Sequence, residues 1–405
     1  MQVIADLHIH SRFSRATSRD INIENLEKWA RLKGISLLGT GDFSHPEWLK
    51  ELKNKLIENE GILRTKSGFP FVLSNEISLI YSERSKGRRV HLIILAPSFE
   101  IVDQINAYLE KKGRLDYDGR PIFNLSCVEL TENLMSISKA IEIIPAHVWT
   151  PWFSIFGSMS GFNSMEEAFE DKIKYIHAFE TGMSSDPAMN WRLSKLDKFS
   201  IVSFSDSHSY WPWRLGREAT VFELKENFSY KDLIDAIRNK EIKFTVETSP
   251  SYGKYHYDGH RLCNFSCSPQ EARKLNNICP ICGKQLTIGV MHRVEELADR
   301  PPGFRPSDAR PFTTLLPLHE LIGAVFKVSM TSNKVWQEYN SLVKVFNNEF
   351  NILLDVPYEE LRKITTPKIV HAIKVNREGK IKVRPGYDGQ YGELILEGEK
   401  QEILF

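Results

Sequence analysis

The N-terminal stretch Val3-Ile4-Ala5-Asp6-Leu7-His8-Ile9-His10 is a short apolar run that ends in two histidines one residue apart. On a β-strand successive side chains alternate between the two faces, so His8 and His10 point to the same side. Two neighbouring imidazoles make a poor hydrophobic core and a good beginning for a metal site. The stretch therefore predicts a strand with metal ligands at its end.

The composition of the chain limits its class. Its 405 residues are enough for two or three domains, and 41% hydrophobic with 26% charged residues is ordinary for a globular protein. With a net charge of +1, the protein as a whole has no strong positive field to attract nucleic acid. Any DNA-binding face must therefore be a local patch of positive charge. There is no apolar run of membrane-spanning length and no basic leader. We expect a cytoplasmic protein without membrane association.

Short apolar runs alternate with amphipathic segments from residue 1 to about 250. Strands are expected over 3–7, 35–40, 71–74, 90–96, 142–145, 175–179 and 201–204, and a helix over 23–33 that ends at Gly34. This order predicts an α/β fold with parallel strands and crossover helices. A barrel is favoured over a doubly wound sheet, because polar residues recur at the strand ends, where barrels gather their active sites.

A group of histidines and carboxylates recurs along these expected strands. Its members are His8, His10, Asp42, Glu76, His91, His147, Asp206 and His208. A single strand histidine is more often a hydrogen-bonded core residue, but the whole group has the ligand types of Zn²⁺, Mn²⁺ or iron. Metal ions a few ångströms apart can activate water and clamp a phosphate group. The pattern therefore predicts a hydrolytic centre with more than one metal ion.

These residues fall into motifs that resemble the PHP (polymerase and histidinol phosphatase) superfamily. The motifs are Asp6-Leu7-His8-Ile9-His10-Ser11, Thr40-Gly41-Asp42, His147 after Ile144-Pro145-Ala146, and Ser205-Asp206-Ser207-His208. The resemblance implies a distorted (β/α)7-type barrel with two or three catalytic divalent ions (Zn²⁺, Mn²⁺ or Mg²⁺). It also implies hydrolysis of phosphate esters.

Carried over by position, the resemblance implies a set of ligands for each ion. The first ion would be held by His8, His10, Glu76 and Asp206; the second by Glu76, His91 and His147; the third by His208 with residues of the second motif. Catalysis is expected from His8, His10, Glu76, Asp206 and His208. The second motif departs from the family pattern, because Phe43 follows Asp42 where histidine is usual. His45 or Asp42 is then the substitute ligand, and Arg15 occupies a place where the family tends to supply another.

Four of the five cysteines form a cluster, and Cys127 stands alone as an expected buried residue. The cluster is Cys263, Cys267, Cys279 and Cys282. Two close pairs of cysteines, with Gly283 for a turn of positive φ, predict one structural Zn²⁺ site in a zinc ribbon. Free thiolates of this kind suit a reducing compartment better than a disulfide framework does.

Three domains follow from this organisation: a catalytic barrel over 1–250, a four-cysteine module over 251–311 and a C-terminal α+β domain over 312–405. In the last we expect helices over 333–350, 358–363 and 367–375, and a strand pair over 380–384 and 393–396.

Candidate substrate contacts lie beside the predicted ligands. They are the basic residues Arg84, Arg88 and Arg214 and the aromatic residues Trp152 and Trp211. Basic residues can follow a phosphate backbone, and aromatic rings can stack on an unpaired base. A solvated loop and core packing are the alternatives. The final residues 401–405 are faintly similar to a sliding-clamp-binding peptide.

The order of barrel, cysteine module and C-terminal domain, with Gly386-Tyr387-Asp388-Gly389-Gln390-Tyr391-Gly392, resembles the endonuclease Q family over essentially the whole chain. That resemblance implies a DNA repair endonuclease that cuts 5′ of uracil, hypoxanthine, xanthine or an abasic site and leaves a 3′-hydroxyl. The lesion would be flipped out of the duplex. The alternatives are a phosphatase for a small phosphate monoester and a zinc-ribbon DNA-binding scaffold with an inactive barrel. We expect a monomer.

Overall fold

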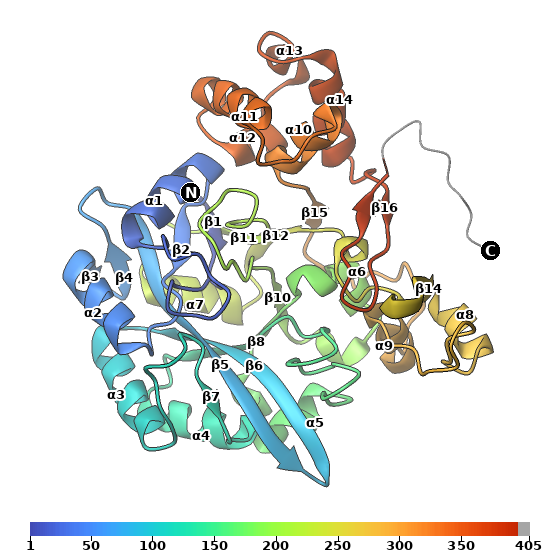
Figure 1. Cartoon of the computed structure of the whole chain (residues 1–405). Helices are drawn as coiled ribbons and strands as arrows, with labels where there is room; N and C mark the ends of the chain where they lie inside the picture. The colour runs from blue at the N-terminus through green and yellow to red at the C-terminus, as the bar shows by residue number, and fades with distance from the viewer. Residues whose placement is uncertain (396–405) are drawn as a thin grey trace.

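The computed structural model describes residues 1–395. Figure 1 shows an α/β body, a helical lobe above it, and a smaller lobe beside it that contains the cysteine module. The α/β class that the sequence predicts is confirmed. The similarity of the last residues to a clamp-binding peptide lies outside the described residues.

A mixed sheet of 11 strands forms the centre of the body. Its strands are β1 (Gln2–Asp6), β2 (Leu37–Gly39), β3 (Ile57–Asn59), β4 (Ile62–Arg64), β5 (Pro70–Glu83), β6 (Lys86–Ala96), β7 (Ile122–Phe123), β8 (Glu142–Pro145), β11 (Ala219–Glu223), β12 (Ile242–Glu247) and β15 (Phe312–Thr314). The order is β15-β12-β11-β1-β2-β5-β4-β3, with β6 and β7 beside β5 and β8 beside β6. Alternate residues of β5 enter two separate buried clusters, Phe71 and Leu73 in one and Val72 in the other. Both faces of the sheet are therefore covered.

A closed barrel of parallel strands is not confirmed. The parallel order holds for β1, β2 and β5, but β1–β11, β11–β12, β5–β6 and β6–β8 are antiparallel pairs. Within the described chain, β9 (Ala178–Glu180) and β10 (Ser200–Val202) form a separate two-stranded parallel sheet. The turn between β5 and β6 consists of Arg84 and Ser85, both with positive φ. A two-residue turn of this type can join only antiparallel neighbours, which explains the departure from the predicted βαβ order.

The β5–β6 hairpin is longer than the sequence predicts. We expected a strand over 71–74 with Glu76 just after it, yet β5 continues to Glu83, and Figure 1 shows the hairpin projecting as a long arm. Glu76 and His91 therefore lie within strands instead of at their ends. The register pairs Ser78 with His91, so Glu76, two residues before Ser78, shares a face with His91.

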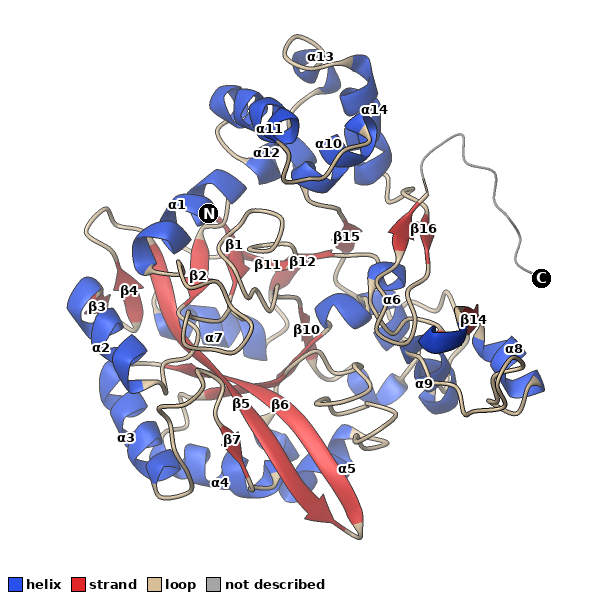
Figure 2. Ribbon diagram, viewed as in Figure 1, coloured by secondary structure: helices blue, strands red, loops and turns tan. Residues whose placement is uncertain are grey.

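Helices flank the sheet of the body (Figure 2). They are α1 (Ile23–Lys33), α2 (Pro46–Lys55), α3 (Phe99–Glu110), α4 (Cys127–Ile137), α5 (Met165–Phe169), α6 (Pro187–Asn190) and α7 (Tyr230–Arg238). Short 3₁₀ turns are η1 (Glu170–Tyr175), η2 (Gly182–Ser184), η3 (Ser194–Leu196), η4 (Pro250–Tyr252) and η5 (Arg261–Cys263). The prediction of α1 is confirmed at both ends. Asn22 caps its first turn, and Gly34 ends it with a φ of 96°.

The two smaller lobes follow the body in sequence. The first contains β13 (Asp258–His260), β14 (Phe265–Cys267), α8 (Pro269–Lys274) and α9 (Val290–Leu297). The helical lobe contains α10 (Leu318–Phe326), α11 (Asn333–Phe346), α12 (Glu349–Leu354), α13 (Tyr358–Leu361) and α14 (Pro367–Arg377). The single helix predicted over 333–350 is divided into α11 and α12 at Asn347, whose φ is 70°.

The C-terminal elements do not all belong to the helical lobe. β15 pairs with β12 of the central sheet. The predicted strand pair is present as β16 (Val383–Arg384) and β17 (Glu393–Leu394), and it lies beside the cysteine module (Figure 1). The Gly386 N–H donates to the Ser251 carbonyl at 2.9 Å. The proposed domain boundaries at 250 and 311 therefore remain a prediction.

Tryptophans join the helical lobe to the body. The Trp336 ring centroid on α11 lies 5.5 Å from that of Trp29 and 5.6 Å from those of Trp211 and Trp213. Beside this cluster, Lys33 Nζ is 2.7 Å from Glu349 Oε1, and neither side chain is more than 2% exposed. The segment that follows Asp206 and His208 is therefore packed against the helical lobe.

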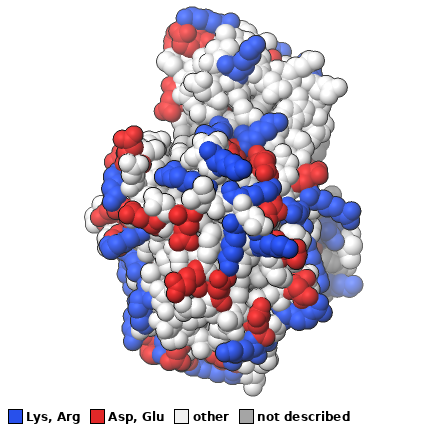
Figure 3. All heavy atoms as spheres, turned by 90° about the vertical axis from the view of Figure 1, so that its left-hand side faces the viewer, with Lys and Arg blue, Asp and Glu red and all other residues white. Residues whose placement is uncertain are grey.

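The surface carries both signs of charge. Figure 3 shows Lys and Arg interspersed with Asp and Glu over one face, in agreement with the near-zero net charge. Among residues 1–395, the structure has no helix that combines the length and the apolar character needed to cross a bilayer.

Glu247, the last residue of β12, is a buried carboxyl group of the body. It accepts hydrogen bonds from the hydroxyls of Thr181 at 2.9 Å and Ser203 at 3.0 Å. Burial dominates and raises the pKa of Glu247 from 4.5 to about 8, against the hydroxyl donors, which lower it. The folded state therefore binds this proton more tightly than the unfolded chain does.

We expect Glu247 to make the protein less stable as the pH rises from about 5 to about 8. The stabilisation from protonated Glu247 is complete below the pKa that this group has in the unfolded chain. It is lost as the pH rises through the pKa of the folded state, and the free energy of unfolding then falls by at most about 1.4 kcal/mol per pH unit. Glu247→Gln should flatten this slope and raise the melting temperature at pH 8, whereas the exposed Glu241→Gln should not. Melting curves across this range are the measurement, and an unchanged slope in Glu247→Gln contradicts the prediction.

Candidate metal centre

His8 and His10 lie just after β1, and each is oriented by a carboxylate. His8 Nδ1 is 3.0 Å from Glu180 Oε1, and His10 Nδ1 is 3.0 Å from Asp42 Oδ1. A carboxylate that accepts the Nδ1 proton leaves the lone pair on Nε2, as in metal-binding histidines. His8 Nε2 is buried and has no hydrogen-bond partner in the described part of the chain. The donor set and its orientation therefore fit a metal ion.

Glu76 joins two groups of potential ligands. The ligand atoms of the first lie within 4.8 Å of one another, as do those of the second. The first group is His8, His10, Glu76 and Asp206, and the second is Glu76, His91 and His147. Glu76 Oε1 is 2.7 Å from His91 Nδ1, and Oε2 is 3.3 Å from His10 Nε2. The structure thus brings together the residues that the resemblance implies for the first two ions.

Three residues of this region have strained backbone conformations. Asp42, His147 and Asp206 have φ values of 48°, 30° and 48°, in a region that non-glycine residues rarely adopt. The His147 N–H donates to Glu180 Oε2 at 2.8 Å, which helps to hold this conformation. Strain of this kind is concentrated at functional sites, where it aims side chains.

The carboxylates of the centre are held in their anionic form. Burial raises the pKa of Glu76, but His91, Arg120 and His8 outweigh it and hold the pKa well below 4.5. Burial lowers the pKa of His8, yet Glu180, Asp206 and Glu76 raise it well above 6.5. The site therefore concentrates negative charge that favours cations.

At this centre, no third group of ligands that includes Asp42, His45 or His208 forms among the described residues. His45 lies outside both groups, and its ring stacks on Phe13 with centroids 4.2 Å apart. Asp42 also accepts hydrogen bonds from Ser11 N at 2.6 Å and Ser14 Oγ at 2.9 Å, so it orients His10. The expectation that Asp42 or His45 completes a third site is therefore not supported.

The two remaining motif residues, His208 and Phe43, lie in different surroundings. The His208 ring is 4.6 Å from that of His10, and its side chain is one-third exposed. His208 therefore lies at the solvent-exposed edge of the centre. Its catalytic role remains a prediction. Phe43 is fully buried in the core, where a histidine would be poorly accommodated.

Comparisons with known proteins show which family the chain belongs to. Residues 317–380 match the family model described as the MJ0043 C-terminal domain. The crystal structure of the lesion-specific endonuclease PfuEndoQ from Pyrococcus furiosus is 31% identical, with a TM-score of 0.88, over 100% of this chain and 98% of that chain. A structure of endonuclease Q with a 27-mer duplex substrate that has an abasic lesion at the active site is 32% identical, with a TM-score of 0.88, over 100% of both chains. The chain belongs to the endonuclease Q family.

This membership confirms the family predicted from the sequence motifs. An uncharacterized protein, MJ0043 of Methanocaldococcus jannaschii, is 32% identical over 299 residues, which are 72% of this chain and 36% of that protein. The chain thus spans about a third of the length of this curated relative.

In this member of the endonuclease Q family, Arg120 is a site residue that sequence reasoning missed. Its Nη1 is 3.0 Å from Glu76 Oε2, although the two residues are 44 positions apart. It lies in the loop between α3 and β7, and no motif marks it. At Gly119, the preceding residue, a Cβ would lie 2.2 Å from Asp42 Oδ2, so the loop lies tightly against the centre.

Two of the basic candidates differ in their surroundings. Arg88 is 3% exposed; its guanidinium lies 3.8 Å from the Phe162 ring centroid and 2.9 Å from Glu167 Oε1. These contacts favour a packing role for Arg88, and its contact with substrate stays a prediction. Arg84, at the tip of the β5–β6 hairpin, has a 69% exposed side chain and remains a candidate.

The two aromatic candidates, Trp211 and Trp152, also differ in their surroundings. Trp211 stacks on Trp213 at 5.3 Å and belongs to the cluster beneath the helical lobe, which favours core packing over base stacking. Trp152 is half-buried with its ring 5.6 Å from Tyr255, and Arg214 is half-buried. Substrate contact by Trp152 and Arg214 remains a prediction.

The cysteine module gathers a different set of donors from the one expected. The ligand atoms of His260, Cys263, Cys279 and Cys282 lie within 4.8 Å of one another, and Cys267 is not among them. Cys267 ends β14 on its buried side and packs with Ala272 and Leu286. The signal was present in the sequence, because His260-x2-Cys263 and Cys279-x2-Cys282 have matching spacings. Gly283 has the expected positive φ, 72°.

We expect His260, not Cys267, to be the fourth ligand of this ribbon. His260→Ala should then lower the metal content of the purified protein by one ion per chain, because a tetrahedral Zn²⁺ site loses a ligand. Cys267→Ser, at a cysteine of the same module, should retain the full content. Elemental analysis of both variants is the measurement. Loss of metal from Cys267→Ser alone contradicts this assignment.

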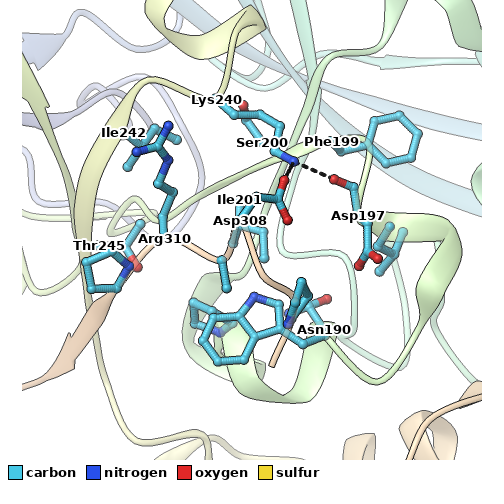
Figure 4. A pocket seen from close by; sticks show the side chains of 16 residues that line it. Asn190, Asp197, Phe199, Ser200, Ile201, Lys240, Ile242, Thr245, Asp308 and Arg310 are labelled. Atoms are coloured by element: carbon cyan, nitrogen blue, oxygen red, sulfur yellow. Dashed lines mark hydrogen bonds and ion pairs between the residues drawn. The ribbon is translucent and has the colours of Figure 1, made fainter. Parts of the chain in front are cut away.

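A small cavity of about 40 Å³ lies beside β10, and Ser200 and Ile201 of this strand contribute to its lining (Figure 4). Ser200, Lys240 and Asp308 contribute to its lining, and Lys240 Nζ donates to the Asp197 carbonyl at 2.7 Å. The cavity contains none of the predicted ligands and has room for only a few water molecules. It is therefore not the catalytic site.

Proposed function

We propose that this protein is a metal-dependent DNA repair endonuclease. It cuts the phosphodiester bond 5′ of a deaminated base (uracil, hypoxanthine or xanthine) or of an abasic site. The observation that carries the proposal is the pair of ligand groups that share Glu76, in a chain similar to endonuclease Q along its whole length. The lesion specificity of PfuEndoQ and the abasic duplex in the second structure support the substrate class.

Two divalent ions, of Zn²⁺, Mn²⁺ or Mg²⁺, supply Lewis acidity and a nucleophilic water when they are bound. His8, His10 and Asp206 would hold one ion, His91 and His147 would hold the other, and Glu76, a member of both ligand groups, would contribute to each. Glu180 and Asp42 keep the two N-terminal histidines in the orientation that this requires. In the hydrolysis, a water oxygen would form a bond to phosphorus and give up a proton, and the bond from phosphorus to the 3′ oxygen would break. That oxygen takes up a proton, so the products are a 3′-hydroxyl and a 5′-phosphate.

The remaining features fit this proposal. The ribbon would hold one structural Zn²⁺ and stabilise the lobe beside the centre. DNA is the expected partner, the cytoplasm is the expected location, and a monomer is sufficient because both ligand groups come from one chain. Binding of a sliding clamp through residues 401–405 is also a proposal.

A nicking assay tests this function. A duplex with one uracil at a defined position, labelled at the 5′ end of the damaged strand, is incubated with and without a chelator. We expect one break on the 5′ side of uracil, absent with the chelator and absent from the matched undamaged duplex. Release of phosphate from histidinol phosphate without any nick would favour the phosphatase. Tight DNA binding without either reaction would favour the scaffold.

A further inference from the structure

Two arginines near the metal centre are held by one buried carboxylate. Asp118 is 3% exposed, and its Oδ1 accepts hydrogen bonds from the backbone of Arg15 at 3.4 Å and of Arg120 at 3.1 Å. Its Oδ2 is 3.4 Å from Arg15 Nε. Asp118 thus couples the segment after the first motif to the loop that carries Arg120.

The guanidinium groups are placed differently. Arg120 is 24% exposed and reaches Glu76 Oε2 through Nη1 at 3.0 Å. Arg15 is 74% exposed and lies further out. A guanidinium has five N–H donors. In the described part of the chain, Nη1 is the side-chain nitrogen of Arg120 that has a hydrogen-bond partner. Donors therefore remain for a second acceptor beside the centre.

The charge of the centre explains why such donors matter. Glu76, Asp206, Asp42 and Glu180 carry four negative charges, which two divalent ions only balance. Asp118 adds a fifth. A phosphodiester is itself an anion, so its approach needs further positive charge. Arg15 and Arg120 supply it, in the planar geometry that suits phosphate oxygens.

We propose that Arg120 and Arg15, positioned by Asp118, form a phosphate clamp beside the metal centre. Arg120 contacts a non-bridging oxygen of the scissile phosphate, and Arg15 contacts a neighbouring phosphate of the same strand. This inference rests on the proposed function, because it assigns these residues to a nucleic-acid substrate. The alternative is that Arg120 only neutralises and positions Glu76.

Three variants and one control separate these roles. The variants are Arg120→Gln, Arg120→Lys and Arg15→Gln. The control is Arg114→Gln, an exposed arginine of the same loop that pairs with Asp116 and has no contact with Glu76 among the described residues. Metal content and melting temperature are measured first for each protein, so that loss of the centre or of folding is detected directly.

The first readout is binding of an undamaged duplex by fluorescence anisotropy at several salt concentrations. The slope of log affinity against log salt should fall by about 0.9 for each phosphate that the protein no longer neutralises. We expect this decrease in Arg120→Gln and in Arg15→Gln. Arg120→Lys and Arg114→Gln should keep the original slope.

The second readout is single-turnover cleavage of the uracil duplex at saturating enzyme. Arg120→Gln should lower the plateau rate by about 100-fold, because it removes a donor to the reacting phosphate. Arg120→Lys should recover part of this activity. Arg15→Gln should raise the enzyme concentration needed for half-maximal rate and leave the plateau within a factor of about three.

Two results overturn the clamp. One is an unchanged salt slope and plateau rate in Arg120→Gln. The other is an unchanged salt slope with a lower metal content, which would mean that Arg120 acts only through Glu76. If the wild-type protein does not cut the uracil duplex, the proposed function fails instead. The clamp is then tested by the salt slope and by hydrolysis of bis(p-nitrophenyl) phosphate.

Discussion

Substitution of Glu76 by glutamine lowers the cleavage rate of a uracil-containing duplex by at least about 1,000-fold, equivalent to about 4 kcal/mol in the activation barrier. Glu76 is the one residue shared by both ligand groups, with Oε1 2.7 Å from His91 and Oε2 3.3 Å from His10. Glutamine keeps the shape of the side chain but removes its charge and turns one acceptor into a donor. Both metal sites are weakened by one substitution.

Glu223→Gln is the matched control for this experiment, since Glu223 is an exposed carboxylate of the same sheet that pairs with Lys243. Single-turnover nicking and metal content are measured together. The control should behave as wild type. A Glu76→Gln protein that cuts at the wild-type rate with its metal content intact would show that Glu76 is not the bridge between the sites.

Substitution of Lys33 by methionine destabilises the protein by about 3–5 kcal/mol, because it leaves a buried carboxylate without its partner. Lys33 Nζ lies 2.7 Å from Glu349 Oε1 and donates to the Pro212 carbonyl at 2.8 Å. Glu349 is fully buried where the helical lobe meets the body. The neighbouring Trp336 ring makes tryptophan emission sensitive to separation of the two lobes, so a red shift should accompany the destabilisation.

The double variant Lys33→Met/Glu349→Gln should regain most of the stability, since no unpaired charge remains. Lys53→Met is the control, because Lys53 and Asp103 form an exposed ion pair. Its loss should lower the free energy of unfolding by less than about 1 kcal/mol. Chemical denaturation followed by tryptophan fluorescence gives all three values. Equal midpoints for Lys33→Met and Lys53→Met would mean that the buried pair does not stabilise the interface.

The parts of the fold and site that local patterns determine could be predicted from sequence. Asn22 and Gly34 bound α1 through capping chemistry that is visible in the residues themselves. The period of two placed His8 and His10 together, and the motifs led to the partners that the structure gathers around Glu76. Each of these inferences used residues whose spacing alone carries the information.

Features that depend on tertiary packing were missed or misplaced. Nothing in the run 71–74 indicates that β5 continues to Glu83, because its length depends on pairing with β6. Arg120 reaches Glu76 only through the fold of its loop. His260 is different: its spacing was readable, but a cysteine at position 267 suggested a simpler set of ligands.

Anomalous diffraction from crystals loaded with Mn²⁺ tests directly whether two metal ions bind about Glu76, as we propose. We expect two peaks in the body, one among His8, His10 and Asp206 and one between His91 and His147, with Glu76 in contact with both. A single peak, or peaks that do not involve Glu76, would contradict a two-metal centre built on this residue.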